Sequence, residues 1–161
     1  MGLLSKQAEE WVLLTTAREN DKLRGYVFYT LERIGGTPAV VMGLASVERN
    51  NKRATTLRSL MSEVYHRALM AFPDEDVVVG GRFALPDALQ ALKEVDDVIP
   101  APASRAVGEE RAWGRRLAKR FGVDGSYVAE QFMSTKNPSG GFIDFESARP
   151  EKIAAGTKGL F

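Results

Sequence analysis

The segment Val47–Phe72 reads VERNNKRATTLRSLMSEVYHRALMAF, and the rest of the chain is arranged around it. It begins at the end of an apolar, strand-like run, passes through a polar, basic turn and continues as an amphipathic helix. Its apolar residues recur at steps of three and four, the spacing that places them on one face of a helix. These residues are Leu57, Leu60, Met61, Val64, Tyr65, Ala68, Leu69 and Phe72. We expect Thr55 or Thr56 to cap the start of the helix and Pro73 to end it.

The turn before this helix has the features of an anion-binding site. A strand, a loop and a helix N-terminus together direct backbone amides and the positive end of the helix dipole toward one point. Lys52 and Arg53 add side-chain cations at the same place. A second interpretation stays open, in which the segment is a helix packed on the core and binds nothing.

The composition limits the chemistry that the chain can perform. The 161 residues include no cysteine and one histidine, His66, which excludes disulfides, thiol catalysis, thiolate-bound metals and His-rich metal sites. The formal net charge is +1, so any basic surface that attracts nucleic acid or a membrane is local. No apolar run reaches the roughly 20 residues of a membrane span. We therefore expect a globular cytoplasmic protein with no bound metal and no membrane association.

The segments before the central stretch predict a helix and a β-hairpin. Apolar residues between positions 3 and 19 can share one helical face. Leu23–Ile34 and Pro38–Ser46 flank Gly35-Gly36, which indicates two antiparallel strands joined by a tight turn. The second strand lacks alternation, so we expect it to be buried on both faces. Gly43 within it marks a bulge or a close backbone approach.

The segments after the central helix predict one short strand, two helices and a closing hairpin. Val77–Val79 is a buried strand, and Pro86 suits the first position of a helix. Glu109–Phe121 has acids at its start and bases at its end, as the helix dipole favours. Residues 126–134 and 140–146 both alternate, which indicates two paired strands.

This order of elements predicts one α+β domain over residues 1–148, with a mixed central β-sheet flanked by helices. The tail over residues 149–161 carries Pro, Gly and Lys, and we expect it to be loosely ordered.

The order also resembles the GNAT superfamily of acyl-CoA-dependent N-acyltransferases, over about residues 23–146. In that family a strand–turn–helix unit binds the CoA pyrophosphate through backbone amides, with the motif Gln/Arg-x-x-Gly-x-Gly/Ala. Lys52 takes the first place of the motif, Thr55 the place of the first glycine and Leu57 the last place. Neither glycine is present, although glycine is what lets a backbone approach a pyrophosphate closely.

The resemblance implies acetyl-CoA or another acyl-CoA as cofactor and an amine-bearing small molecule or protein as acceptor. Tyr127 is the candidate proton donor to the leaving thiolate, and Glu48 is the candidate base for the amine. The alternative, which the residues favour, is that each of the two is structural or solvated. The candidate cofactor-binding residues are Lys52, Arg53, Ala54, Thr55, Thr56, Leu57 and Arg58.

The predicted helix Glu109–Phe121 carries a cluster of bases: Arg111, Arg115, Arg116, Lys119 and Arg120. Three of them, at positions 111, 115 and 119, follow one ridge of the helix. Such a ridge can contact the phosphates of a nucleic acid or an acidic protein. The alternative is that the bases only solvate an outer face.

Two functions therefore stay open. The first is a GNAT-like acyltransferase that moves an acetyl or acyl group from CoA to an amine. The second is a noncatalytic binding or regulatory protein of GNAT-like fold that engages a protein or nucleic acid. Loss of the motif glycines is known among GNAT-like proteins that no longer catalyse, including some small phage proteins.

Overall fold

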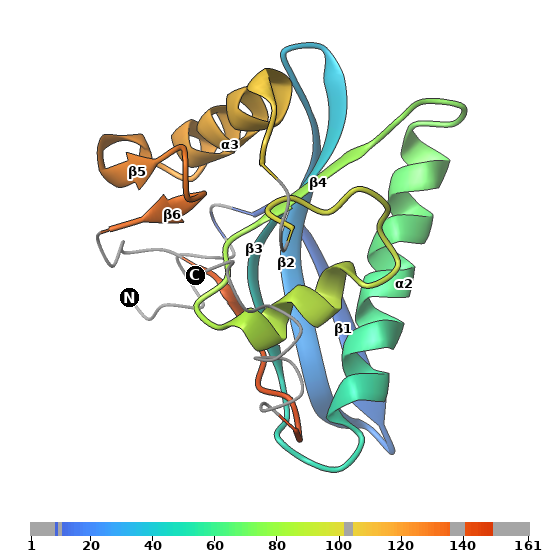
Figure 1. Cartoon of the computed structure of the whole chain (residues 1–161). Coiled ribbons are helices and arrows are strands. Elements are labelled where there is room, and N and C mark those ends of the chain that lie inside the picture. The colour runs from blue at the N-terminus through green and yellow to red at the C-terminus, as the bar shows by residue number, and fades with distance from the viewer. Residues whose placement is uncertain (1–8, 10, 102–104, 136–140, 150–161) are drawn as a thin grey trace.

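The computed structural model describes residues 9, 11–101, 105–135 and 141–149. The predicted loose tail, residues 149–161, lies outside this description except for Arg149. The architecture is α+β with a mixed sheet, as predicted (Figure 1).

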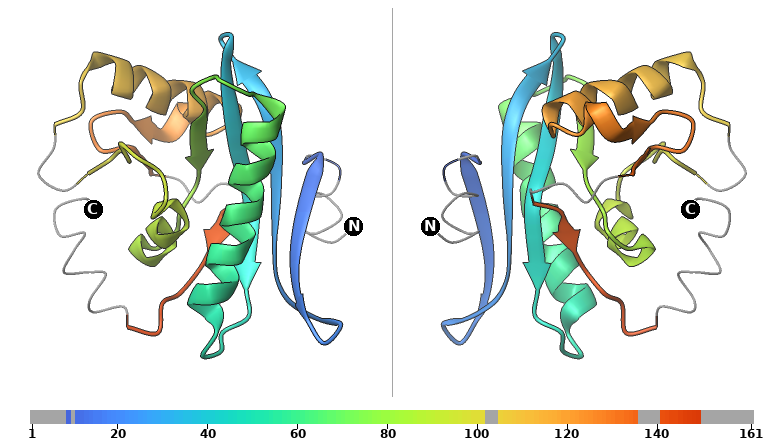
Figure 2. Two further views of the ribbon diagram at one scale, coloured as in Figure 1. Left: turned by 90° about the vertical axis from the view of Figure 1, so that its right-hand side faces the viewer. Right: turned by 90° about the vertical axis from the view of Figure 1, so that its left-hand side faces the viewer.

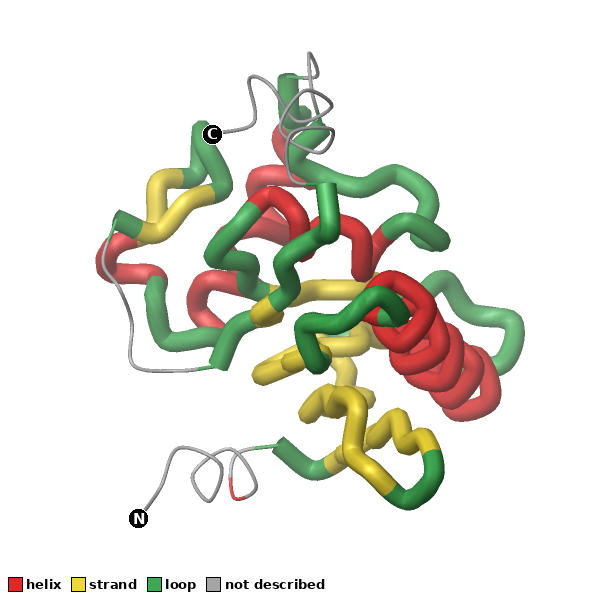
Figure 3. Tube along the Cα trace, turned by 90° about the horizontal axis from the view of Figure 1, so that it is seen from below, coloured by secondary structure: helices red, strands yellow, loops and turns green. Residues whose placement is uncertain are grey.

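The first half of the chain builds the sheet and its longest helix. β1 (Leu13–Glu19), β2 (Lys22–Ile34) and β3 (Thr37–Val47) form an antiparallel meander. α2 (Arg53–Ala71) then crosses to β4 (Val78–Gly81), which pairs with β3 in parallel. α2 lies along one face of the sheet and packs against the first three strands (Figure 3).

The second half of the chain consists of shorter elements. They are η1 (Pro86–Leu92), α3 (Gly108–Arg120), η2 (Asp124–Ser126), β5 (Tyr127–Val128), β6 (Met133–Ser134) and β7 (Ile143–Asp144). The expected helix after Pro86 is thus a short 3₁₀ helix, and the expected Glu109–Phe121 helix is α3 to within one residue at each end.

The predicted β-hairpin is confirmed, together with the burial of its second strand. Gly35 and Gly36 adopt φ values of +59° and +89°, which a tight turn between these strands requires. β3 is buried along nearly its whole length, because α2 covers one face, and Trp11 and Phe121 pack with Val41 and Leu44 of β3 on the other.

The predicted helix over residues 3–19 is wrong over residues 11–19, although Glu9 is helical. Residues 13–19 form β1 and pair with β2, from Leu13 opposite Tyr29 to Glu19 opposite Lys22. The edge of β2 offers unpaired backbone groups, and tertiary pairing outweighs the weak helical pattern of this short segment. Residues 3–8 and 10 of the predicted helix lie outside the described residues.

The predicted closing hairpin is also wrong. β5 and β6 both come from the first predicted strand and pair with each other, Tyr127 opposite Ser134. β7 instead joins β3 in parallel, with Ala45 opposite Ile143. Ile143 and Phe145 are 1% and 3% exposed, so the alternation of apolar and polar residues over 140–146 correctly indicated a strand with one buried face. Alternation does not say which strand is the partner.

The apolar face of α2 is confirmed, but its predicted cap is not. Five residues of the stripe are buried: Leu57, Leu60, Met61, Val64 and Ala68. Leu69, predicted in the stripe, is 63% exposed. The helix begins at Arg53 with Lys52 as its N-cap, so Thr55 and Thr56 lie inside the first turn. The Thr56 hydroxyl donates to the carbonyl of Lys52 at 3.2 Å rather than capping an amide.

Candidate functional site

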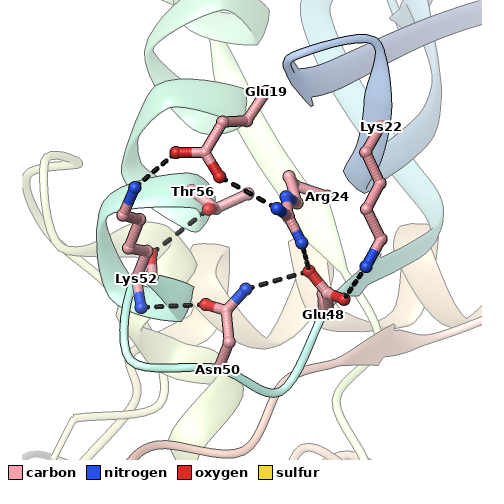
Figure 4. A network of polar contacts seen from close by, with 7 residues as sticks. All are labelled: Glu19, Lys22, Arg24, Glu48, Asn50, Lys52 and Thr56. Carbon is pink, nitrogen blue, oxygen red and sulfur yellow. Dashed lines mark hydrogen bonds and ion pairs between the residues drawn. The ribbon is translucent and has the colours of Figure 1, made fainter.

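The turn between β3 and α2 is closed by a network of charged side chains (Figure 4). Lys52 pairs with Glu19 at the end of β1. Arg24 of β2 bridges two carboxylates, Glu19 at 3.0 Å and Glu48 by a short contact. Lys22 reaches the second oxygen of Glu48 at 3.2 Å. The network thus places each cation against at least one carboxylate of the same chain.

Backbone and amide contacts complete this turn. Asn50 donates to Glu48 at 2.9 Å and accepts from the backbone amide of Lys52 at 2.8 Å. Arg53 donates through Nε to the carbonyl of Asn50 at 2.8 Å and through Nη1 to the carbonyl of Glu146 at 3.3 Å. Asn50 therefore shapes the loop as an Asx turn, and Arg53 ties the helix start to the segment after β7.

The candidate base Glu48 has an unfavourable environment for accepting a proton. Hydrogen bonds from Arg24 and from Lys22 lower the pKa of the Glu48 carboxyl. The hydrogen bond from Lys52, with the charges of Lys52 and Arg24, likewise lowers the pKa of Glu19. A general base works best when its pKa lies near the working pH, so these contacts weaken Glu48 as a base.

The candidate cofactor-binding residues divide into exposed and enclosed positions. Ala54, Thr55 and Arg58 are exposed at the start of α2, and Thr56 is half-buried. Leu57 is 2% exposed and packs in the core, so its side chain does not obstruct the approach to the turn. In α-helix geometry the amides of Ala54 and Thr55 have no intrahelical acceptor, whereas the amides of residues 52, 53 and 56 are bonded within the turn.

The structure does not bring the two catalytic candidates together. Tyr127 lies in the β5–β6 hairpin beside α3, at the opposite end of the molecule from the β3–α2 turn that carries Glu48 (Figure 2). The Tyr127 hydroxyl is buried against Gly114, where an added Cβ would lie 2.1 Å away. It has no hydrogen-bond partner among the described residues.

Burial also changes the acidity of Tyr127. Burial raises the pKa of its hydroxyl, the Glu130 carboxylate adds to this, and Arg115 opposes it. A phenol with a raised pKa is a weaker proton donor. The acidity of Tyr127 and its distance from the β3–α2 turn therefore both argue against it as the proton donor to a leaving thiolate. Tyr127 of β5 instead packs against α3, in the space beside Gly114.

The basic cluster on α3 is only partly available to a partner. Arg120 donates to Glu32 at 2.7 and 3.0 Å and stacks on Trp11 at 5.0 Å, so it joins α3 to the sheet. Arg116 lies over the ring of Trp113 at 4.9 Å. The three ridge residues Arg111, Arg115 and Lys119 are exposed. Within the described part of the chain they form no salt bridge.

Comparison with known proteins adds no relative to these observations. No model of a protein family, no curated protein and no solved structure matches this chain significantly.

No helix of the described residues is long and apolar enough to cross a membrane. In the same residues, no three or more His, Cys, Asp or Glu side chains gather as a metal site.

Sequence reasoning missed the acids that close the β3–α2 turn. Glu19 lies in the segment predicted as a helix, and Glu146 in the segment predicted as a local hairpin. Their approach to Lys52, Arg53 and Arg49 depends on how β1 and β7 pair, and no local pattern encodes that pairing. The nearest sequence signal for such ion pairs was that acidic residues are almost as numerous as basic ones, 21 against 22.

Proposed function

We propose that this protein is a noncatalytic binding module whose α3 ridge contacts the phosphate backbone of a nucleic acid. The contrast between two basic surfaces supports this. Three cations at the β3–α2 turn, Lys22, Arg24 and Lys52, pair with carboxylates of the same chain. Arg111, Arg115 and Lys119 instead face solvent without a salt bridge in the described structure. The separation of Glu48 from Tyr127 supports the noncatalytic part of the proposal (Figure 2).

The ridge has the geometry for tracking a charged backbone. Successive ridge residues are four apart, which corresponds to a rise of about 6 Å along the helix. Three cations in a row neutralise phosphates without reading bases, so the expected binding is independent of sequence and sensitive to salt. Trp113 is engaged by Arg116 and is only half-exposed, so base stacking on it is not part of the proposal.

The test is fluorescence anisotropy with labelled 20-nucleotide single- and double-stranded DNA and RNA over a salt series. With about three phosphate contacts, the slope of log K against log salt is expected near −2 to −3. The triple variant Arg111→Gln, Arg115→Gln, Lys119→Gln should lose most of the affinity and flatten this slope.

The matched control removes the same charge from other exposed positions: Arg18→Gln, Lys93→Gln, Arg149→Gln. It should retain the wild-type affinity and slope. Equal losses in the two triple variants, or no binding to any of the four nucleic acids, would contradict the proposal. The second outcome would leave an acidic protein surface as the partner class to be tested.

The second candidate function is binding of acetyl-CoA or another acyl-CoA at the β3–α2 turn, with acyl transfer to an amine acceptor on a GNAT-like fold. Two observations favour it. Ala54 and Thr55 are exposed residues whose amides have no intrahelical acceptor, and the core position of Leu57 keeps its side chain away from them. The surface pair of Lys52 and Glu19 is weak enough for a pyrophosphate to displace.

Thermal unfolding with millimolar acetyl-CoA or CoA tests this candidate. At about 100 times the dissociation constant, a ligand adds about 2.7 kcal/mol of stability, which raises Tm by roughly 5–10 °C in a chain of this size. The shift should vanish in Lys52→Ala, Arg53→Ala and persist in the control Arg18→Ala, Lys93→Ala. If neither ligand shifts Tm in the wild type, the acyltransferase proposal fails.

A further inference from the structure

A cleft of about 1510 Å³ lies beside β4, the edge strand of the sheet. Its lining comes from Val77–Val79, from residues 95–101 after η1, from α3 and from residues 130–133 of the β5–β6 hairpin. Pockets for drug-sized molecules are roughly 300–1,000 Å³. The larger volume suits a segment of polypeptide better than a compact small molecule.

The backbone of β4 offers unused hydrogen-bonding groups to this cleft. β4 pairs with β3 along its inner side. Just beyond β4, the carbonyl of Arg82 accepts from the amide of Ile143 at 2.7 Å and so also faces inward. Backbone groups of successive residues in an extended strand alternate sides. Val79 and Gly81 therefore direct their amides and carbonyls outward, and no described residue pairs with them there. Val79 lines the cleft, and Gly81 continues the same edge just beyond the lining.

Walls from both faces of the sheet flank this edge (Figure 2). On the side of α2, η1 is held by a hydrogen bond from the Tyr65 hydroxyl to the carbonyl of Ala91 at 2.5 Å. On the other side, α3 places Leu117 over Gly80, where an added Cβ would lie 2.5 Å from it. Because side chains of a strand alternate between faces, an added strand would present its side chains to both walls in turn.

The charged residues that line the cleft are mostly acidic. They comprise five carboxylates, Asp96, Asp97, Glu109, Glu110 and Glu130, and two guanidinium groups, Arg105 and Arg111. The lining therefore carries a formal excess of three negative charges at neutral pH, next to apolar surface from Val98, Trp113 and Phe132. A cationic ligand with apolar side chains complements both properties.

We propose that the cleft binds an extended, cationic segment of a partner protein, which adds to the sheet as a strand beside β4. Hydrogen bonds to Val79 and Gly81 supply the pairing, and the acidic lining selects lysine or arginine side chains. This site shares only Arg111 with the α3 ridge, because Arg115 and Lys119 do not line the cleft. It requires no nucleic acid and no CoA.

The test uses three labelled hexapeptides and the full-length protein, measured by fluorescence anisotropy. The first peptide alternates lysine and valine, the second glutamate and valine, and the third lysine and proline. The second reverses the charge, and the third keeps the charge but has fewer backbone donors. We expect the lysine–valine peptide to bind about tenfold more tightly than either of the others.

Two variants of one β4 residue separate backbone pairing from side-chain contact. Val79→Pro removes the outward amide, which an edge strand tolerates on its open side, and should weaken binding of the lysine–valine peptide about tenfold. Val79→Thr keeps the amide and the branched shape, and should bind like the wild type. In NMR spectra, the peptide should shift and protect the amides of Val79 and Gly81 more than those of Val78 and Gly80.

A charge variant gives the answer even if Val79→Pro does not fold. Asp96→Asn, Asp97→Asn, Glu130→Gln alters only exposed side chains and should reduce binding of the lysine–valine peptide while leaving thermal stability near that of the wild type. The proposal is overturned if the lysine–valine peptide does not bind. Equal binding of the three peptides, or binding that neither Val79→Pro nor the charge variant alters, overturns it as well.

Discussion

Glu48 illustrates how neighbouring residues change the chemistry of one side chain. Its position beside a basic turn made it a candidate base. In the folded chain Arg24, Lys22 and Asn50 all bond its carboxylate, and the cations lower its pKa. A carboxylate that is stabilised in its charged form holds the turn together better than it accepts a proton.

This environment predicts a pH dependence of stability. The folded-state pKa values of Glu48 and Glu19 lie below the unfolded value of about 4.3. Their contribution to stability is therefore complete above the unfolded pKa and is lost as the pH falls through the folded pKa. In urea unfolding between pH 7 and pH 3, the wild type should lose stability on acidification, and Glu48→Gln should lose less.

The control for this prediction is Glu109→Gln, which removes an exposed carboxylate with no salt bridge in the described structure. Its pH profile should follow that of the wild type. If Glu48→Gln and wild type lose stability in parallel as the pH falls, the carboxylate network does not stabilise the fold.

At the scale of elements, β3 depends on one glycine. Val27 of β2 lies opposite Ala45 of β3, and Tyr29 lies opposite Met42. One residue of β2, Phe28, therefore faces two residues of β3, Gly43 and Leu44, so β3 bulges by one residue at this point. The sequence predicted a bulge or a close approach at Gly43, and both occur. Trp11 packs directly on this glycine and holds Phe121 of the segment after α3 at a ring distance of 6.2 Å.

We therefore predict that Gly43→Ala destabilises the fold. An added Cβ would lie 2.0 Å from a ring carbon of Trp11, so the indole must move from a site where it is 4% exposed. Overpacking of this kind costs about 1–3 kcal/mol, which thermal unfolding by circular dichroism would register as a lower Tm.

Gly108→Ala is the matched control, because nothing lies within 4 Å of an added Cβ at that position. It should leave Tm unchanged or raise it slightly, since alanine favours a helix start more than glycine does. A Tm for Gly43→Ala equal to that of the wild type would mean that the contact with Trp11 does not constrain β3.

At the scale of the whole molecule, the predicted functional residues separate into two groups. The β3–α2 turn lies at one end, and α3 with the β5–β6 hairpin lies at the other, as the two views of Figure 2 show. β4 and its cleft run between η1 and α3. Because of this separation, Glu48 and Tyr127 cannot act together in a single catalytic centre in this conformation.

The sequence by itself determined the elements whose cause is local. The stripe from Leu57 to Ala68 specifies α2, the Gly35-Gly36 pair specifies the turn of the first hairpin, and unbroken apolar character specifies a strand buried on both faces. The order of charges along α3 likewise follows the helix dipole. These signals act over a few residues, so they are readable without the rest of the chain.

The tertiary structure alone decided which segments pair and which charges meet. Residues 13–19 became a strand because β2 had an open edge, and β7 joined β3 rather than a neighbour in sequence. Those two choices bring the Glu19 carboxylate to Lys52 and the Glu146 carboxylate to Arg49, so carboxylates surround the basic β3–α2 turn. The physical reason is that strand pairing and ion pairing depend on distances in space, and residues such as Arg49 and Glu146, far apart in the chain, acquire those distances only on folding.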